Sequence, residues 1–162
     1  MKKMVAVLSL LLCFCAANAQ SSGIQKASAY VEVSIPGMII RDENGNDIKP
    51  EPIIERFIYL ECRSAGKPSI DSVLYNGILF SASITETGKK YVDVGVKKEN
   101  GLPVKLSSKK GNHIWKIELQ QSTGKPLPHE LVKNIIIKGM LDKKKFCYTV
   151  HTETELSTPD RY

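Results

Sequence analysis

Long apolar runs are scarce in this sequence of 162 residues, and the one near its start is short. Val5–Ala16 is apolar, whereas a membrane-spanning helix needs about 20 such residues in a row. The sequence also lacks a low-complexity segment, a domain linker and a glycine-rich loop of the kind that cradles phosphate groups. These absences argue against an integral membrane segment in the mature chain, against a second domain and against nucleotide binding.

Groupings of catalytic or metal-binding residues are missing as well. The histidines are His113, His129 and His151, and they form neither a His-Glu-x-x-His motif nor a pair at helical spacing, which argues against zinc. No Gly-x-Ser-x-Gly elbow is present. The alternation in Thr152–Glu155 is typical of a solvent-facing strand and not of two glycosidase carboxylates facing across a cleft. We therefore expect no cofactor, no metal and no enzymatic activity.

One segment resembles a calcium loop at first sight. In Arg41–Lys49, R-D-E-N-G-N-D-I-K, side chains that carry oxygen alternate from Asp42 onward. An EF-hand loop counted from Asp42 needs glycine at its sixth position and glutamate at its twelfth, where this sequence has Asp47 and Ile53. Lys97–Lys105 repeats the shape of the segment without its two aspartates. A turn between two strands therefore explains both segments better than a metal site does.

Residues 1–19 have the pattern of a cleavable export signal. Lys2 and Lys3 precede the apolar stretch, and Ala17–Ala19 supplies small residues before a cleavage point at Gln20. Cleavage would leave 143 residues (162 − 19), and the formal charge would fall from +6 to +4 with the loss of the two lysines.

A lipoprotein is the alternative, with Cys13 or Cys15 as the lipid-bearing residue. Lipid-bearing cysteines usually follow a small residue, whereas these two follow Leu12 and Phe14. Glutamine directly after an Ala-Asn-Ala site is common in envelope proteins of Gram-negative bacteria, to which the chain has a general likeness. We therefore expect a soluble protein of the periplasm or cell surface of such a bacterium.

The positive charge is spread along the sequence in small groups. They are Lys89-Lys90, Lys97-Lys98, Lys109-Lys110 and Lys143–Lys145. Solvation of turns and strand ends is the simplest explanation, and contact with an anionic envelope surface or polysaccharide is the alternative. Nucleic acid is not expected as a partner, because few aromatic residues are interleaved with the lysines.

Cys62 and Cys147 remain after cleavage, and an even pair in an exported protein predicts a disulfide. Strand alternation works against this bridge. Phe146 and Val150 share one face of their strand, so Cys147 lies on the other, whereas Cys62 aligns with apolar Leu60. We favour the bridge, and the alternatives are a bulge that turns Cys147 inward or two unbridged thiols.

Alternation of apolar and polar residues dominates the rest of the chain and predicts half-buried strands. The expected strands are Tyr30–Ile35, Met38–Ile40, Arg56–Cys62, Ser69–Tyr75, Ile78–Thr85, Tyr91–Val96, Ile114–Leu119, Ile135–Met140 and Phe146–Leu156. Asn-Gly pairs between several of them suit tight hairpins, and only Pro128–Asn134 offers a helical turn.

This pattern predicts an all-β fold, namely an antiparallel β-sandwich of about eight or nine short strands, immunoglobulin-like in the broad sense. A small β-barrel is the alternative. Residues 28–162 would form this single domain, preceded by a flexible arm at 20–27.

Aromatic side chains are the last candidates for binding. Trp115 aligns with Ile117 and Leu119 and is expected in the core. Tyr30 and Tyr91 fall on the polar faces of their strands, so we expect them as exposed surface contacts.

The expected function is that of an exported, non-enzymatic binding or accessory module of the bacterial cell envelope, acting through protein–protein contacts. Its partner would be another envelope protein or a glycan. One alternative is a carbohydrate-binding or carbohydrate-active module, and another is a structural subunit that assembles through edge strands.

Overall fold

The computed structural model describes residues 23–35, 37, 40–48, 52–63, 66–88, 90–120 and 133–158. The predicted export signal at 1–19 and most of the predicted helical turn, residues 128–132, lie outside the described residues. Among the described residues, no helix is long and apolar enough to cross a membrane.

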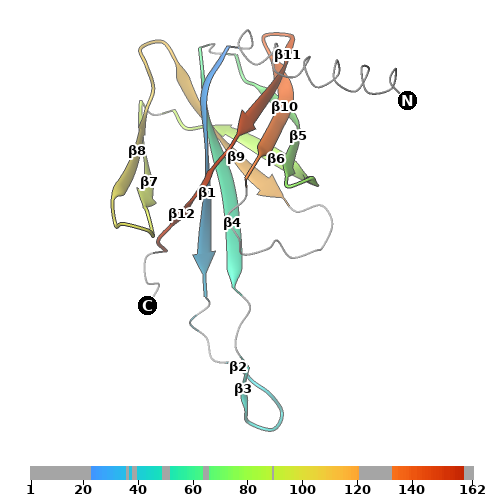
Figure 1. The fold of residues 1–162 in the computed structure, drawn as a ribbon, viewed down its shortest axis with the longest axis vertical. Coiled ribbons are helices and arrows are strands. Elements are labelled where there is room, and N and C mark those ends of the chain that lie inside the picture. The colour runs from blue at the N-terminus through green and yellow to red at the C-terminus, as the bar shows by residue number, and fades with distance from the viewer. Residues whose placement is uncertain are drawn as a thin grey trace, which may run out of the picture.

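The described chain is all-β, as the sequence predicts, and its strands form one large sheet and two small ones (Figure 1). The strands are β1 (Ile24–Ser34), β2 (Ile40–Arg41), β3 (Asp47–Ile48), β4 (Ile53–Cys62), β5 (Ser69–Tyr75), β6 (Ile78–Glu86), β7 (Tyr91–Val96), β8 (Pro103–Ser107), β9 (His113–Gln120), β10 (Ile135–Leu141), β11 (Lys144–Val150) and β12 (Glu153–Leu156).

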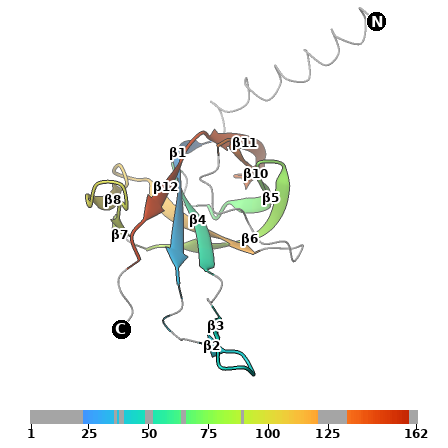
Figure 2. The same cartoon turned by 60° about the horizontal axis from the view of Figure 1, so that its bottom comes forward.

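The large sheet has eight strands in the order β11-β10-β5-β6-β9-β4-β1-β12. The strands β11 and β12 lie at opposite ends of this order, yet only His151 and Thr152 separate them in the chain. So short a connection requires the sheet to curl until its two edges meet, and β1 does contact β11. The result is a half-barrel, intermediate between the expected sandwich and the alternative barrel (Figure 2).

The last strand corrects two expectations. The sequence predicts one strand over Phe146–Leu156 in an antiparallel sheet, whereas the structure has two strands, and β12 pairs with β1 in parallel. The chain leaves one edge of the curled sheet after Val150 and joins the opposite edge at Glu153. Parallel pairing follows because β12 continues in nearly the same direction as β11 (Figure 1).

The hydrophobic core fills the inside of the half-barrel. Its fully buried members come from five neighbouring strands, β10, β5, β6, β9 and β4. They include Ile58, Leu60, Val73, Phe80, Ile117, Ile135 and Ile137. Trp115 belongs to this cluster, which confirms its expected place in the core. Burial of such side chains at about 25 cal/mol per Å² is the main force that holds the sheet in its curl.

A second apolar cluster lies on the outside of the same sheet. The ribbon of β7 and β8 covers the outer face of β1, β4 and β9 and buries Val92, Val94 and Val104 against it. This covering gives part of the molecule two packed β-layers, as a sandwich has.

The start of the domain also differs from the expectation. Residues 24–27 belong to β1 and not to a flexible arm, because Ile24 is buried in the core and pairs with Cys62 of β4. The carbonyl oxygen of Gly23 accepts a hydrogen bond from the Arg63 backbone, 2.9 Å away, which fixes the beginning of the strand. Residues 20–22 lie outside the described residues.

Candidate functional site

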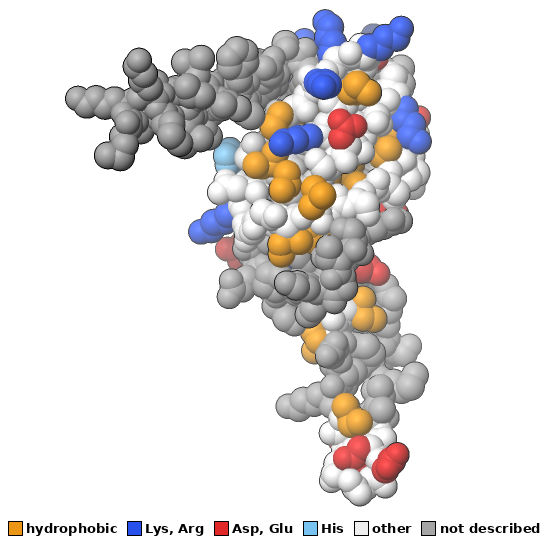
Figure 3. All heavy atoms as spheres, turned by 90° about the vertical axis from the view of Figure 1, so that its right-hand side faces the viewer, with side chains coloured by type: hydrophobic (Ala, Val, Ile, Leu, Met, Phe, Trp, Pro, Cys, Tyr) orange, Lys and Arg blue, Asp and Glu red, His pale blue; other side chains and the backbone are white. Residues whose placement is uncertain are grey.

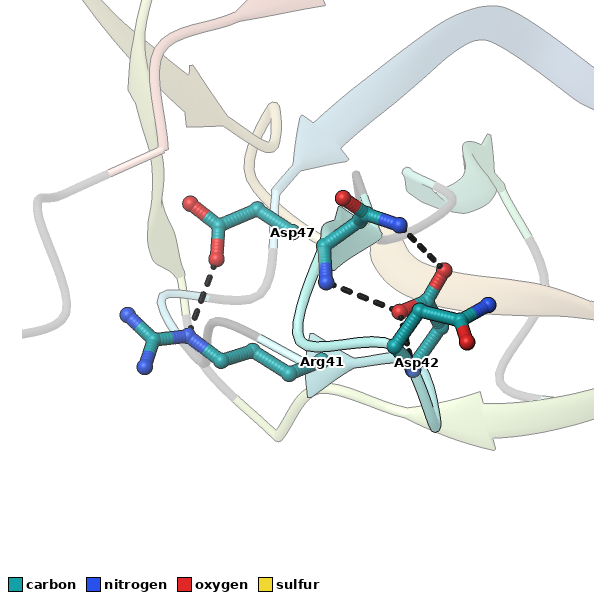
Figure 4. A network of polar contacts seen from close by, with 5 residues as sticks. Arg41, Asp42 and Asp47 are labelled. Atoms are coloured by element: carbon teal, nitrogen blue, oxygen red, sulfur yellow. Dashed lines mark hydrogen bonds and ion pairs between the residues drawn. The ribbon is translucent and has the colours of Figure 1, made fainter.

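A hairpin formed by β2 and β3 projects from the body, and we call residues 40–48 the arm (Figures 1 and 2). Asp42 organises its tip: one carboxylate oxygen accepts the backbone N–H groups of Asn44 at 2.9 Å and Asn46 at 2.8 Å (Figure 4). The other accepts the side-chain amide of Asn46 at 3.0 Å. Hydrogen bonds to the carboxylate lower the pKa of Asp42. The bond from the Asn46 side chain contributes most, and those from the backbone N–H groups add to it.

This geometry confirms the turn interpretation of the calcium-like segment. The Asp42 carboxylate is occupied by amides of its own loop, and Asp47 forms an ion pair with Arg41 at 3.1 Å (Figure 4). Among the described residues, no group of three or more acidic, histidine or cysteine side chains is arranged to hold a metal ion. The tip is therefore an acidic turn held by hydrogen bonds within its own loop.

Apolar side chains are exposed on the outer face of β5, β6 and β10. Leu74 of β5 pairs with Leu79 of β6 on one side and with Ile136 of β10 on the other, and we call these three residues the apolar row. The side chains of Val73, Tyr75 and Phe80 point the opposite way into the core, so alternation directs the apolar row outward.

Leu79 is the exposed member of this row, and Leu74 and Ile136 are half-buried. Leu79 is 54% exposed, and Met140 of β10 is exposed as well. Figure 3 shows hydrophobic side chains gathered on this face. Ile48 of the arm is exposed as well. Apolar residues on both faces of a strand are typical of a strand that is covered on both sides.

A hollow of about 340 Å³ lies between the β6–β7 and β8–β9 connections, and we call it the basic hollow. Among the described residues, three lysines line it, Lys90, Lys109 and Lys110, against one carboxylate, that of Glu86. Glu86 lies 2.7 Å from Nδ1 of His113, which also lines the hollow. The basic hollow therefore carries an excess of positive charge together with hydrogen-bonding groups.

The walls of this hollow are held in place by the body of the protein. Glu61 of β4 accepts the backbone N–H of Lys109 at 2.9 Å and the side-chain amide of Asn112. The backbone N–H of Ser108 bonds to the carbonyl oxygen of Lys90 at 3.1 Å, which ties the two connections together. The lysines consequently project from a fixed backbone.

The structure brings together only part of the lysine groups seen in the sequence. Lys90 and the pair Lys109-Lys110 are far apart in the chain but meet at the basic hollow. Lys98 instead forms an ion pair with Glu155 at 2.6 Å, and Lys143–Lys145 lie at the β10–β11 turn.

The two tyrosines expected at the surface have different positions. Tyr91 is 65% exposed, as expected, and its ring lies 5.6 Å from the Lys90 ammonium beside the basic hollow. Tyr30 is only 5% exposed, which corrects the expectation for this residue. It packs against Phe57 and Tyr59 under the β7–β8 ribbon, because the polar face of β1 is the face that the ribbon covers.

No disulfide joins Cys62 and Cys147 in the structure. Cys62 is buried in the core, and Cys147 alternates with core residues Phe146 and Val150, so the two thiols lie on opposite faces of the sheet. Burial raises the pKa of the Cys62 thiol to about 12. This arrangement disfavours the disulfide between Cys62 and Cys147 that the sequence predicts. The disulfide therefore stays a prediction.

A buried ion pair corrects the expectation that Thr152–Glu155 faces solvent. Nε of Arg56 in β4 lies 3.2 Å from Oε1 of Glu153 in β12. The two side chains are 1% and 0% exposed. The Arg56 guanidinium lies 5.6 Å from the Tyr75 ring centroid. Burial raises the pKa of Tyr75, so its hydroxyl stays protonated beside this pair.

The edge of β12 is covered by its own chain. The backbone N–H of Lys98 bonds to the carbonyl oxygen of Glu155 at 3.0 Å, and that of Ser157 bonds to Val96 at 2.7 Å. Lys97 forms a β-bridge with Leu156. This edge is therefore closed to a strand from another molecule.

No family model, no curated protein and no solved structure matches this chain.

Proposed function

We propose that this chain is an exported, non-enzymatic module of the bacterial cell envelope that binds another envelope protein through the outer face of β5, β6 and β10, with the arm as a second contact. The apolar row carries this proposal, because Leu74, Leu79 and Ile136 form a continuous cross-strand patch in which, among the described residues, Leu79 is exposed and the other two are half-buried. Contiguous apolar patches on the surface of a protein mark sites of interaction.

The arm suggests the chemistry of the partner. Its exposed Ile48 stands next to a tip that carries Asp42, Glu43 and Asp47 against a single Arg41. A surface complementary to the arm would combine an apolar slot with a basic rim. The apolar row would supply the desolvated centre of such an interface and the acidic tip its charged margin.

The covered edge of β12 favours this mode of binding over strand addition at that edge. Partner addition to β12 would require displacement of the hydrogen bonds from Lys98 and Ser157. Binding through the sheet face leaves every strand pairing intact.

A pair of leucine substitutions tests the proposal. Leu79 and Leu102 are 54% and 57% exposed, and Leu102 lies in the β7–β8 ribbon away from the apolar row. Tagged protein with Leu79→Asp or Leu102→Asp would be used to recover partners from the envelope fraction of the native host, with circular dichroism as the check on folding.

We expect wild type and Leu102→Asp to retain the same envelope protein in near-stoichiometric amount and Leu79→Asp to lose it. Equal retention by both variants would contradict a role for the apolar row. Recovery of glycan without protein would contradict the protein-binding proposal and favour the carbohydrate-binding alternative.

A further inference from the structure

We propose that the basic hollow binds an acidic saccharide, a sugar that carries a carboxylate group, and that this site is independent of the protein-binding face. The volume of about 340 Å³ falls within the usual range of small-molecule sites, roughly 300–1,000 Å³, and suits a ring-sized ligand. The three lysines supply the attraction for its negative charge.

The polar groups of the hollow match a sugar better than a bare inorganic anion. A sugar ring presents hydroxyls that both donate and accept hydrogen bonds, and the lining includes Glu86 and Ser108 beside the lysines. The contact of His113 with Glu86 uses Nδ1. The Nε2 atom of His113 makes no hydrogen bond within the described part of the chain. It is therefore available to a hydroxyl.

The backbone of the β8–β9 connection argues against a phosphate site. Proteins often hold phosphate in a nest of converging backbone N–H groups. Here the Lys109 N–H bonds to Glu61 and the Asn112 N–H bonds to the carbonyl oxygen of Lys109, 3.0 Å away. The connection thus uses these amides to fix its own shape and binds through its side chains.

An aromatic ring and an adjoining hollow extend the site. Tyr91, next to Lys90, exposes a ring on which a sugar can stack. A second hollow of about 110 Å³ shares Ile114 with the first and is lined by Lys26 and Lys105. An acidic oligosaccharide with charges on successive units would have lysines available along its length.

Two matched variants each lose three positive charges, one at the basic hollow and the other at the β10–β11 turn. The hollow variant combines Lys90→Gln, Lys109→Gln and Lys110→Gln, and the turn variant combines Lys143→Gln, Lys144→Gln and Lys145→Gln. All six lysines are exposed, so neither variant removes a core contact. Binding of trigalacturonate to the purified protein would be measured by titration calorimetry, with neutral trigalactose, inorganic phosphate and a tri-glutamate peptide as comparison ligands.

We expect trigalacturonate to bind wild type and the turn variant alike and to bind the hollow variant about tenfold more weakly, or not at all. Trigalactose, phosphate and tri-glutamate should bind measurably more weakly than trigalacturonate. Equal weakening in both variants would show attraction by net charge alone and overturn the site. Absence of trigalacturonate binding would overturn the proposal, and so would phosphate or tri-glutamate binding as tightly as the saccharide.

Discussion

Nε of Arg56 lies 3.2 Å from Oε1 of Glu153, and neither side chain reaches solvent. Arg56 belongs to β4 and Glu153 to β12, with β1 between these two strands in the sheet. The ion pair therefore spans β1 and holds the short parallel edge strand against the half-barrel. Burial of two charges is costly, so each depends on the other for compensation.

Replacement of Glu153 by glutamine should strongly destabilise the fold. Glu153→Gln removes the buried carboxylate charge that lies against the Arg56 guanidinium, and we expect the free energy of unfolding to fall by about 3–5 kcal/mol. Urea unfolding followed by tryptophan fluorescence would measure this change through Trp115.

Glu155 on the same strand provides the control. It pairs with Lys98 at the surface, where solvent screens the pair, so Glu155→Gln should cost less than about 1 kcal/mol. Similar losses in the two variants would show that Arg56–Glu153 does not act as a buried pair.

The two cysteines should differ in reactivity. Cys62 is buried and its pKa is raised from 9.0 to about 12, so almost no thiolate forms near neutral pH. Iodoacetamide at about pH 8 should label half-buried Cys147 in the folded protein and Cys62 only after unfolding. Peptide mass spectrometry would read the labelled sites. If neither thiol reacts in denaturant until a reductant is added, the two are bridged.

The raised pKa of Cys62 also predicts a loss of stability in alkali. The unfolded thiol ionises near its ordinary pKa of 9.0, whereas the folded thiol stays protonated up to about 12. Between these values the unfolded state binds fewer protons, so the free energy of unfolding should decrease as the pH rises. Cys62→Ala should remove this part of the pH dependence, measured by urea unfolding at a series of pH values. An unchanged slope would contradict the assignment.

Gly139 of β10 should not tolerate a side chain. A Cβ at this position would overlap the carbonyl oxygen of Ser69 and approach Cζ of Phe146 to 3.0 Å. We expect Gly139→Ala to destabilise the protein by about 1–3 kcal/mol, or to prevent folding, because backbone and core would have to move. Gly37→Ala is the control, since no atom of the described residues lies within 4 Å of its Cβ position. Thermal melts of equal midpoint would contradict the close packing seen at Gly139.

Local sequence patterns predicted much of the fold. Strict alternation in Ile78–Ile84 and Val92–Val96 located β6 and β7, and the Asn76-Gly77 pair forms the expected turn with positive φ at both residues. These features depend on residues near one another in the chain, which is why one sequence sufficed.

Features set by distant parts of the chain could not be predicted in the same way. Tyr30 looked exposed because it lies on the polar face of its strand, and only the packing of the β7–β8 ribbon shows that this face is covered. The partnership of Arg56 with Glu153 and the meeting of Lys90 with Lys109 depend on the curl of the sheet and on loop placement. No local sequence pattern encodes the ion pair or the meeting of the two lysines.

Site-specific photocrosslinking in the native host tests the protein-binding proposal most directly. A photoreactive amino acid would replace Leu79 in the apolar row or, as the control, the equally solvent-exposed Leu102. The proposal predicts one discrete crosslinked protein from position 79 and none from position 102. Crosslinks of equal yield from both positions, or none from position 79, would contradict binding through the outer face of β5, β6 and β10.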